Sequence, residues 1–181
     1  NLIGSVRNDV FNGSDLANRL DGGAGNDWLE GNGGDDVLNG HTGNDLLIGG
    51  AGNDILDGGM TGDPLDLGDQ LEGGAGADTF LFANAGYSVG PYSRDRIMDF
   101  SAAEGDKIDL HGVLAGVTGT YIGNGAFTGV AGQVVIQPGF VDFGLPGVSQ
   151  ILKADLNGDG ISDFSIQVGS TAYLTAGDFI F

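Results

Sequence analysis

The sequence predicts an all-β protein in which a stack of short strands continues into a C-terminal β cap. Three observations support this prediction. A nine-residue pattern, Gly-Gly-x-Gly-x-Asp-x-apolar-x, recurs through residues 1–82, and the eighth place of each copy is apolar. Beyond Phe82 the period stops, and stretches rich in Phe, Tyr, Ile and Val alternate with polar residues. A unit of this size cannot bury its one apolar side chain alone, so the units must stack.

Eight copies of the pattern follow one another, and only one is interrupted, by the insertion at residues 61–66. Five clean copies begin at Gly22, Gly31, Gly40, Gly49 and Gly73. The eighth-position residues are Phe11, Leu20, Leu29, Leu38, Leu47, Leu56, Leu71 and Phe80. The sixth-position residues are Asp9, Asn18, Asp27, Asp36, Asp45, Asp54, Asp69 and Asp78. The two positions therefore predict one buried apolar side chain and one polar side chain in every unit.

Each unit combines a turn with a short strand. The glycines permit positive φ and close backbone approach, so the first six residues form a turn, and the last three alternate like a strand. Burying one leucine stabilises the fold by about 1.5 to 3 kcal/mol. Ordering the backbone of nine residues costs roughly 1 to 2 kcal/mol for each residue. The repeats therefore need another source of free energy.

The aspartates indicate what that source is. Stacked in register, they form a ladder of like charges at a strand spacing of about 4.8 Å, which repulsion would open unless cations lay between the rungs. Carboxylate and turn carbonyl oxygens suit Ca²⁺ better than Zn²⁺ or Cu²⁺, and Mg²⁺ demands stricter octahedral geometry. The sequence therefore predicts several bound Ca²⁺ ions.

The repeats resemble the calcium-binding nonapeptides of RTX proteins. The resemblance implies a right-handed parallel β-roll with two nonapeptides in each coil, in which units i and i+2 share Ca²⁺ through carbonyls at positions one and three and the carboxylate at position six. On one edge of the roll these ligands would be Gly22, Ala24, Asp27, Gly40, Thr42, Asp45 and Asp69. On the other edge they would be Gly31, Gly33, Asp36, Gly49, Ala51, Asp54, Gly73, Ala75 and Asp78.

Departures from the pattern set the expected limits of the roll. Arg7 and Leu16 replace the fourth-position glycine and Asn18 replaces the aspartate, so residues 1–21 are expected to form a degenerate capping coil. In the insertion, Asp63 and Asp66 either add ligands or face water. A Gly/Asp-rich tract is also compatible with disorder when calcium is low. The predicted roll covers residues 1–82 and the predicted cap residues 83–181.

Composition limits the classes of partner. The 181-residue chain has 25 acidic and 6 basic residues and a net charge of -19, so nucleic acid and anionic membranes are poor partners. It has no cysteine, which excludes disulfides and thiolate metal sites. It shows no signal peptide and no apolar run long enough to insert into a membrane. The start at Asn1 suggests a fragment of a larger protein, with an upstream domain.

The cap is expected to contain strands at residues 79–82, 96–100, 107–110, 133–137, 149–154 and 164–168. Residues 94–110 and 154–164 resemble the C-terminal domain of serralysin-type secreted metalloproteases. Four carboxylates in the first of these segments are expected to pair with Arg94, Arg96 and Lys107 or to face solvent. They are Asp95, Asp99, Asp106 and Asp109.

A second metal site is predicted in the cap. Asp155, Asn157, Asp159 and Asp163 match the first nine places of an EF-hand-like loop, and Gly160 supplies the sharp turn. The glutamate of the twelfth place is replaced by isoleucine, as in shorter loops that end on an aspartate. The alternative is a solvated hairpin without metal.

The last four residues, 178–181, resemble the uncleaved export signal of type I secretion substrates, and they also fit a last β-strand. Export through a narrow channel requires an unfolded chain, which low cytosolic calcium would provide. The predicted protein is therefore secreted by bacteria through a type I apparatus and folds outside the cell.

No catalytic site is predicted. The chain has two histidines, His41 and His111, neither in a zinc HExxH motif; His41 is expected to face solvent and His111 to cap a turn. There is no cysteine nucleophile, GxSxG or P-loop. The leading function is a calcium-binding export and folding module of a larger RTX exoprotein. Alternatives are a polysaccharide-binding accessory module, like the R-modules of mannuronan C5-epimerases, and a surface-layer structural module.

Overall fold

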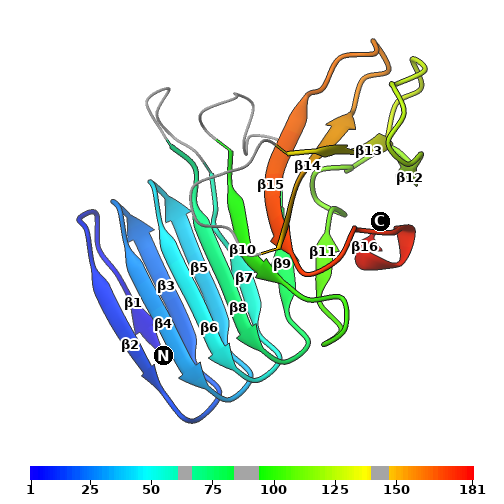
Figure 1. The fold of residues 1–181 in the computed structure, drawn as a ribbon. Helices are drawn as coiled ribbons and strands as arrows, with labels where there is room; N and C mark the ends of the chain where they lie inside the picture. The colour runs from blue at the N-terminus through cyan, green and yellow to red at the C-terminus, as the bar shows by residue number, and fades with distance from the viewer. Residues whose placement is uncertain (61–66, 84–93, 140–146) are drawn as a thin grey trace.

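A computed structural model of the chain describes residues 1–60, 67–83, 94–139 and 147–181, which are almost entirely β (Figure 1). The strands are β1 (Leu2–Ile3), β2 (Val10–Ser14), β3 (Arg19–Ala24), β4 (Trp28–Gly33), β5 (Val37–Thr42), β6 (Leu46–Ala51), β7 (Ile55–Asp57), β8 (Gln70–Ala75), β9 (Thr79–Leu81), β10 (Arg96–Phe100), β11 (Lys107–Asp109), β12 (Thr120–Tyr121), β13 (Gln133–Pro138), β14 (Val148–Asp155), β15 (Phe164–Ser170) and β16 (Phe179–Ile180). One 3₁₀ turn, Ala176–Asp178, precedes the last strand. The all-β prediction is confirmed.

The repeats form a parallel β-roll, as predicted. Odd-numbered strands lie in one sheet and even-numbered strands in the other, and each strand pairs in parallel with the strand one coil further on. Leu20 lies beside Leu38 and Leu29 beside Leu47, so eighth-position residues stack on one another. Two nonapeptides thus make one coil.

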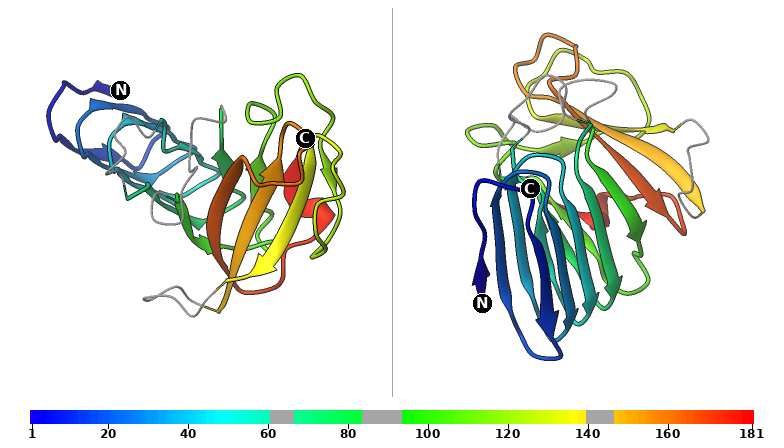
Figure 2. Two further views of the ribbon diagram at one scale, coloured as in Figure 1. Left: turned by 90° about the horizontal axis from the view of Figure 1, so that it is seen from above. Right: turned by 90° about the vertical axis from the view of Figure 1, so that its left-hand side faces the viewer.

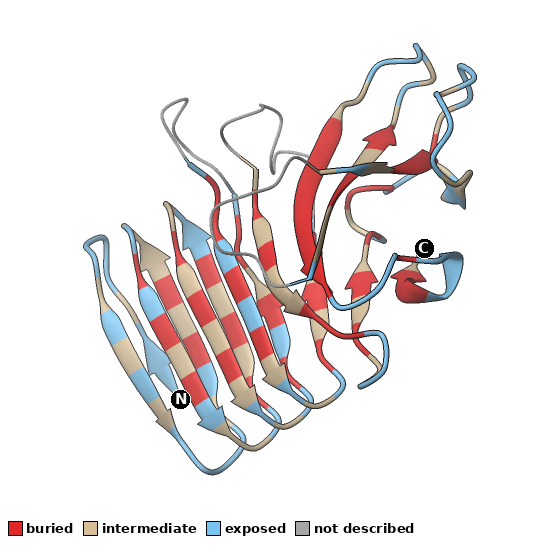
Figure 3. Cartoon of the chain, in the orientation of Figure 1, coloured by how far each residue is buried: buried red, intermediate tan, exposed pale blue. Residues whose placement is uncertain are grey.

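The alternation of side-chain direction along each short strand determines which residues the roll buries. From Leu20 to Phe80, every eighth-position side chain is fully buried, with a relative exposure of 0%. Its neighbours in positions seven and nine point outward and are half-buried or exposed, which gives the banded pattern of Figure 3. The core of the roll is therefore a narrow double row of apolar side chains between the two sheets.

The insertion at residues 61–66 leaves the stacking register intact. Leu47 on β6 lies beside Leu71 on β8, so the eighth position still follows the eighth position. Asp63 and Asp66 lie outside the described residues.

The stack continues past the predicted boundary at residue 82. β10 pairs in parallel with β8, and β11 pairs in parallel with β9. Ile97 lies beside Leu71 and Ile108 beside Phe80, and both isoleucines are fully buried, like the eighth-position residues of the repeats. The observed roll therefore comprises β1 to β11. We call the place where β10 and β11 pair with β8 and β9, the strands of the last nonapeptides, the seam.

The cap, which comprises β12 to β16 and their loops, extends both sheets of the roll. β13, β14 and β15 form an antiparallel meander, and β15 joins the even-numbered sheet by pairing in parallel with β10 (Figure 2). The six strands expected from the sequence after residue 78 all occur, within two residues of their predicted ends. Phe179–Ile180 pairs with β11, so the tail does form a last strand.

The first coil lies at the open end of the roll. Leu2, which lies beside Leu20 in an eighth-position place, is 40% exposed, and Val6 and Leu16 are 83% and 74% exposed. No helix in the described part of the chain is long and apolar enough to cross a membrane.

Candidate calcium sites along two aspartate ladders

Two ladders of sixth-position side chains run along the edges of the roll, where the turns between the sheets stack. In each ladder the backbone N–H of one sixth-position residue donates to the Oδ1 atom of the aspartate one coil further on. The first ladder runs through Asp9, Asp27, Asp45, Asp69 and Asp95, with N···O distances of 2.7 to 2.9 Å. The second runs through Asn18, Asp36, Asp54, Asp78 and Asp106, with distances of 2.6 to 3.0 Å. In both ladders every one of these hydrogen bonds therefore points from the donor to the coil on its C-terminal side.

The repeat glycines make these ladders possible. Gly25, in the fourth position, has a φ of 121°, which a residue with a side chain rarely adopts. Gly31, in the first position, has no space for a Cβ atom, because such an atom would collide with Asp36 Oδ2 and with the carbonyl oxygen of Gly49 on the next coil. The same pair of oxygens surrounds Gly49, where they belong to Asp54 and Gly73.

Gly31, Gly40 and Gly49 therefore each mark a small pocket between two coils. One side of the pocket is the Oδ2 atom of the same unit, and the other is the first-position carbonyl of the unit one coil further on. These are two of the three ligand types that the sequence predicts, at positions six and one. Their convergence fits the hard oxygen ligands that Ca²⁺ takes.

The second carboxylate oxygens are the observation that a cation explains. Asp27, Asp36, Asp54 and Asp78 are only 1 to 3% exposed, and the Oδ2 atom of each is buried and accepts no hydrogen bond from the described residues. A buried ionised oxygen without a donor costs several kcal/mol. A cation in the pocket would supply what the protein does not.

The raised pKa values of the ladder aspartates also indicate that the pockets suit a cation. Burial, followed by the neighbouring carboxylates, raises the pKa of Asp78 to about 7 and that of Asp54 to about 6. Burial likewise raises the pKa values of Asp27 and Asp36. Near neutral pH without a cation, the folded roll therefore resists full ionisation of its ladders.

The predicted third-position ligands take part in other contacts. The carbonyl oxygens of Thr42, Ala51 and Ala75 accept hydrogen bonds of 2.8 to 2.9 Å from the fourth-position N–H of the preceding coil. A carbonyl oxygen has a second lone pair, so these contacts leave room for a metal. Their role as ligands, and that of Ala24 and Gly33, stays a prediction.

In the described segments, no three Asp, Glu or His side chains form a metal cluster by themselves. Each ion on a ladder would therefore take most of its six to eight oxygens from the backbone, with few carboxylates per ion. The repeated glycine turns, which bring carbonyls close together, suit that composition.

The prediction for Asp95 and Asp106 was wrong. Both are buried, and they complete the two ladders by accepting hydrogen bonds from the backbone N–H groups of Asp69 and Asp78, at 2.9 and 3.0 Å. They stand two residues before Ile97 and Ile108. This Asp-x-apolar spacing repeats the tail of the nonapeptide, and it is the signal by which the sequence could have identified them.

In the described part of the chain, Asp99 and Asp109 do not form the ion pairs predicted as one alternative, and both are partly exposed. Asp99 accepts hydrogen bonds from the N–H groups of Gly73 and Gly74, and Asp109 accepts one from the N–H of His111. The basic side chains lie elsewhere. Arg94 Nε donates to Ser165 Oγ and Lys107 Nζ to the carbonyl of Gly177, and within the described residues neither they nor Arg96 form an ion pair with a carboxylate.

The two histidines behave as surface residues. His111 Nδ1 lies 3.0 Å from Asp109 Oδ1 and closes the turn after β11, as expected. His41 is exposed, and its Nε2 lies 2.9 Å from Asp21 Oδ1.

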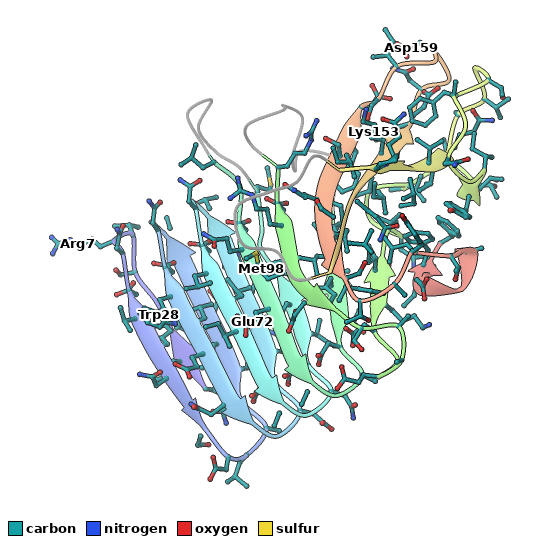
Figure 4. The ribbon with its side chains drawn as sticks, in the orientation of Figure 1. Arg7, Trp28, Glu72, Met98, Lys153 and Asp159 are labelled. Atoms are coloured by element: carbon teal, nitrogen blue, oxygen red, sulfur yellow. The ribbon has the colours of Figure 1, made fainter. Side chains whose placement is uncertain are left out.

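The predicted EF-hand-like loop lies at the tip of the β14–β15 hairpin, where Figure 4 labels Asp159. Asp155 is buried and accepts hydrogen bonds from the N–H groups of Gly158 and Gly160, and Asp163 accepts one from Leu156. Asn157 Oδ1 accepts one from the N–H of Asp159. These contacts hold the loop in a tight turn, and its calcium site stays a prediction.

Comparison with known proteins supports the description of the roll. Four segments match the family model of the RTX calcium-binding nonapeptide repeat, at residues 3–38, 12–47, 30–63 and 66–85, and the first three overlap. The comparison with curated proteins gave no match. Among solved structures, the chain is similar to the AlgE6R3 subunit from the Azotobacter vinelandii mannuronan C5-epimerase, with 28% identity and a TM-score of 0.57. That similarity covers 99% of this chain and 81% of the other.

Proposed function

The repeat segment of this chain consists of RTX calcium-binding nonapeptides, and we propose that the whole chain is the C-terminal export and stabilising domain of a larger exoprotein secreted through a type I apparatus. In this proposal the roll stays unfolded at low calcium and folds when calcium reaches its ladders outside the cell. The carrying observation is the row of buried Oδ2 atoms that accept no hydrogen bond from the described part of the chain, in Asp27, Asp36, Asp54 and Asp78.

The chain's own residues explain why folding would depend on the ion. The stacked aspartates repel one another, and the narrow core of one leucine or phenylalanine per unit offsets little of the entropy of nine ordered residues. Bound Ca²⁺ would supply the positive charge that the ladders lack. Its binding free energy then becomes folding free energy, because the unfolded chain has no preformed site.

A calcium titration followed by far-UV circular dichroism tests this proposal. From a chelated start, we expect a cooperative transition to β structure near millimolar calcium, and no such transition with magnesium, which retains its waters. A spectrum that is already fully β in chelator, and unchanged by calcium, would contradict the folding switch.

The export role needs its own test. Deleting residues 178–181 removes β16 and the acidic and apolar tail. We expect the truncated chain, expressed with a type I apparatus, to stay inside the cell. Because β16 pairs with β11, the truncated protein must first be shown to fold in calcium. Secretion at the level of the intact chain would leave the tail as a structural strand only.

A polysaccharide-binding module is the second candidate. It is favoured by the similarity to the epimerase subunit and by Trp28 on β4, which is 47% exposed on the outer face of the even-numbered sheet (Figure 4). An exposed aromatic ring of this kind can stack on a sugar ring. Binding of an acidic and a neutral glycan to the wild type and to Trp28→Ala, both in calcium, tests it, and equal binding by the two proteins would argue against this surface.

A further inference from the structure

The first coil treats its sixth-position side chains differently from the coils that follow it. Asp9 Oδ2 accepts two hydrogen bonds from its own unit, one from the backbone N–H of Ser5 at 2.8 Å and one from the Ser5 hydroxyl at 2.9 Å. Asn18 Oδ1 accepts one from the N–H of Ser14 at 2.7 Å. In the later coils, the buried Oδ2 atoms of the four aspartates described above accept none from the described residues. Only the first coil therefore provides donors of its own for these oxygens.

The walls of the pocket are nevertheless the same in the first coil. A Cβ atom on Gly4 would meet Asp9 Oδ2 and the carbonyl oxygen of Gly22 on the next coil. At Gly13 the corresponding atoms are Asn18 Oδ1 and another first-position carbonyl of the second coil. The first coil thus has the geometry of the pockets further along the roll, but its side-chain oxygens already accept hydrogen bonds.

The second-position residue explains the difference. From the second coil onward, every second-position residue has a φ between 73° and 110°, including the non-glycine residues Asn32 and His41. Among the described non-glycine residues, Ser5 and Ser14 do not have a positive φ. The sign of φ determines to which side of the chain the N–H of that residue points. In the first coil the N–H meets the sixth-position oxygen, and in the later coils it leaves that oxygen bare.

We propose that the second-position residue determines whether a nonapeptide requires calcium, and that Ser5 and Ser14 close the first coil to the ion. A serine there supplies hydrogen-bond donors where a bound cation would otherwise balance the oxygen. A left-handed residue there leaves the carboxylate dependent on a cation. This inference rests on the proposed calcium-dependent folding, and it identifies the residues that set where the calcium array begins in this chain.

Burial and charge agree with this assignment. Asp9 and Asn18 are partly exposed, whereas Asp27 and Asp36, one coil further on, are 3% and 1% exposed. A bare carboxylate is costly only where water cannot reach it, so the need for a cation begins with the second coil. Asn18 also carries no charge with which to attract an ion.

The fourth position offers a competing explanation. Arg7 and Leu16 stand where later units have a glycine, and both are exposed (Figure 4 labels Arg7). The two donors to Asp9 Oδ2 belong to Ser5, however, and Arg7 contributes its backbone N–H to the Ser5 hydroxyl, at 3.1 Å. Changing the second and the fourth position one at a time therefore separates the two explanations.

The test is the number of calcium ions that the full chain binds at saturating calcium, measured by equilibrium dialysis. We expect Ser5→Gly to bind one ion more than the wild type, because glycine removes the hydroxyl and permits the positive φ that turns the N–H away from Asp9. Arg7→Gly is the matched control. It restores the glycine of the fourth position but keeps Ser5, so it should bind the wild-type number.

The other ladder provides an independent set of variants. Ser14→Gly leaves an uncharged amide oxygen bare and should bind no additional ion. Asn18→Asp introduces the carboxylate but keeps Ser14 as its donor, so it should also bind the wild-type number. The double variant Ser14→Gly/Asn18→Asp has a bare carboxylate and should bind one ion more.

Hydrogen exchange of residues 1–21 at saturating calcium gives a second readout. In Ser5→Gly we expect these amides to be at least as protected as in the wild type, because an ion replaces the donors of the serine. The wild-type ion number in Ser5→Gly, an additional ion in Arg7→Gly, or an unprotected first coil in Ser5→Gly would each overturn the proposal and leave the later sites standing. A wild-type chain that binds no calcium would instead overturn the proposed function.

Discussion

In the roll each nonapeptide from Gly22 onward buries one apolar side chain and one carboxylate, whereas the cap buries apolar side chains together with uncharged polar groups that find hydrogen-bond partners. Every residue of β15 is buried, and Phe82 packs edge-on against Phe164 at a centroid distance of 5.6 Å. Gln150, also buried, donates to Ser170 Oγ at 2.8 Å and accepts from the N–H of Leu174.

The difference concerns where each region obtains its stability. The cap has partners for its buried polar atoms within the chain, so hydrophobic burial contributes in full. The roll has carboxylate oxygens that no donor among the described residues satisfies. The roll therefore depends on its ions, and the cap is expected to remain folded when they are removed.

Calcium removal should produce the largest effect. In excess chelator we expect the backbone amides of β3 to β9 to exchange with solvent within seconds, while those of β13 to β15 stay protected. Hydrogen exchange followed by mass spectrometry resolves the two regions. Equal loss of protection in both would mean that the cap depends on the ions as much as the roll does.

Removing a core residue of the roll should come next. Leu47→Ala creates a cavity at a side chain that is 0% exposed, so the free energy of unfolding in calcium should fall by about 2 to 5 kcal/mol. Leu46→Ala, on the outer face of the same strand, is the control and should cost less than about 1 kcal/mol. Denaturant unfolding in saturating calcium measures both, and similar losses would show that the roll core is not packed as described.

Adding a methyl group separates the two regions more finely. Gly31→Ala places a Cβ against Asp36 Oδ2 and the Gly49 carbonyl, and should cost about 1 to 3 kcal/mol as well as weaken calcium binding. Gly125→Ala in the cap meets no atom within 4 Å, at a φ that other residues adopt, so stability should stay level or rise by about 0.4 to 1 kcal/mol. Thermal unfolding in calcium compares them, and a neutral Gly31→Ala would argue against a tight pocket.

The smallest effect is expected from pH in the absence of metal. The folded pKa values of Asp54 and Asp78, about 6 and 7, exceed the ordinary value of 3.8, so the folded roll binds more protons than the unfolded chain between these limits. Stability without calcium is therefore greatest at acid pH and falls as the pH rises through 6 and 7. In chelator, the fluorescence of Trp28, the one tryptophan, should report a larger folded fraction of the roll at pH 5 than at pH 8. The opposite order would contradict these shifts.

The repeats made the roll predictable from sequence. Because the eighth position is apolar in every unit and the sixth is a carboxylate in all but one, the spacing alone assigns both the core and the ladders from Asp9 to Asp78. The strands of the cap were also predictable, since β-branched and aromatic residues alternate there. Their partners were not, because nothing local specifies that β15 pairs with β10.

At the seam, the position of the residues in the stack could no longer be predicted from the sequence. By itself the sequence determined an all-β chain, a parallel stack of nonapeptides and the need for a cation, because a strict period repeats the same local physics in every unit. Only the tertiary structure decided that Asp95, Asp99 and Asp106 belong to that stack. The chain between the last repeat and these residues departs from the period, so their place depends on which strands pair in space rather than on spacing along the sequence.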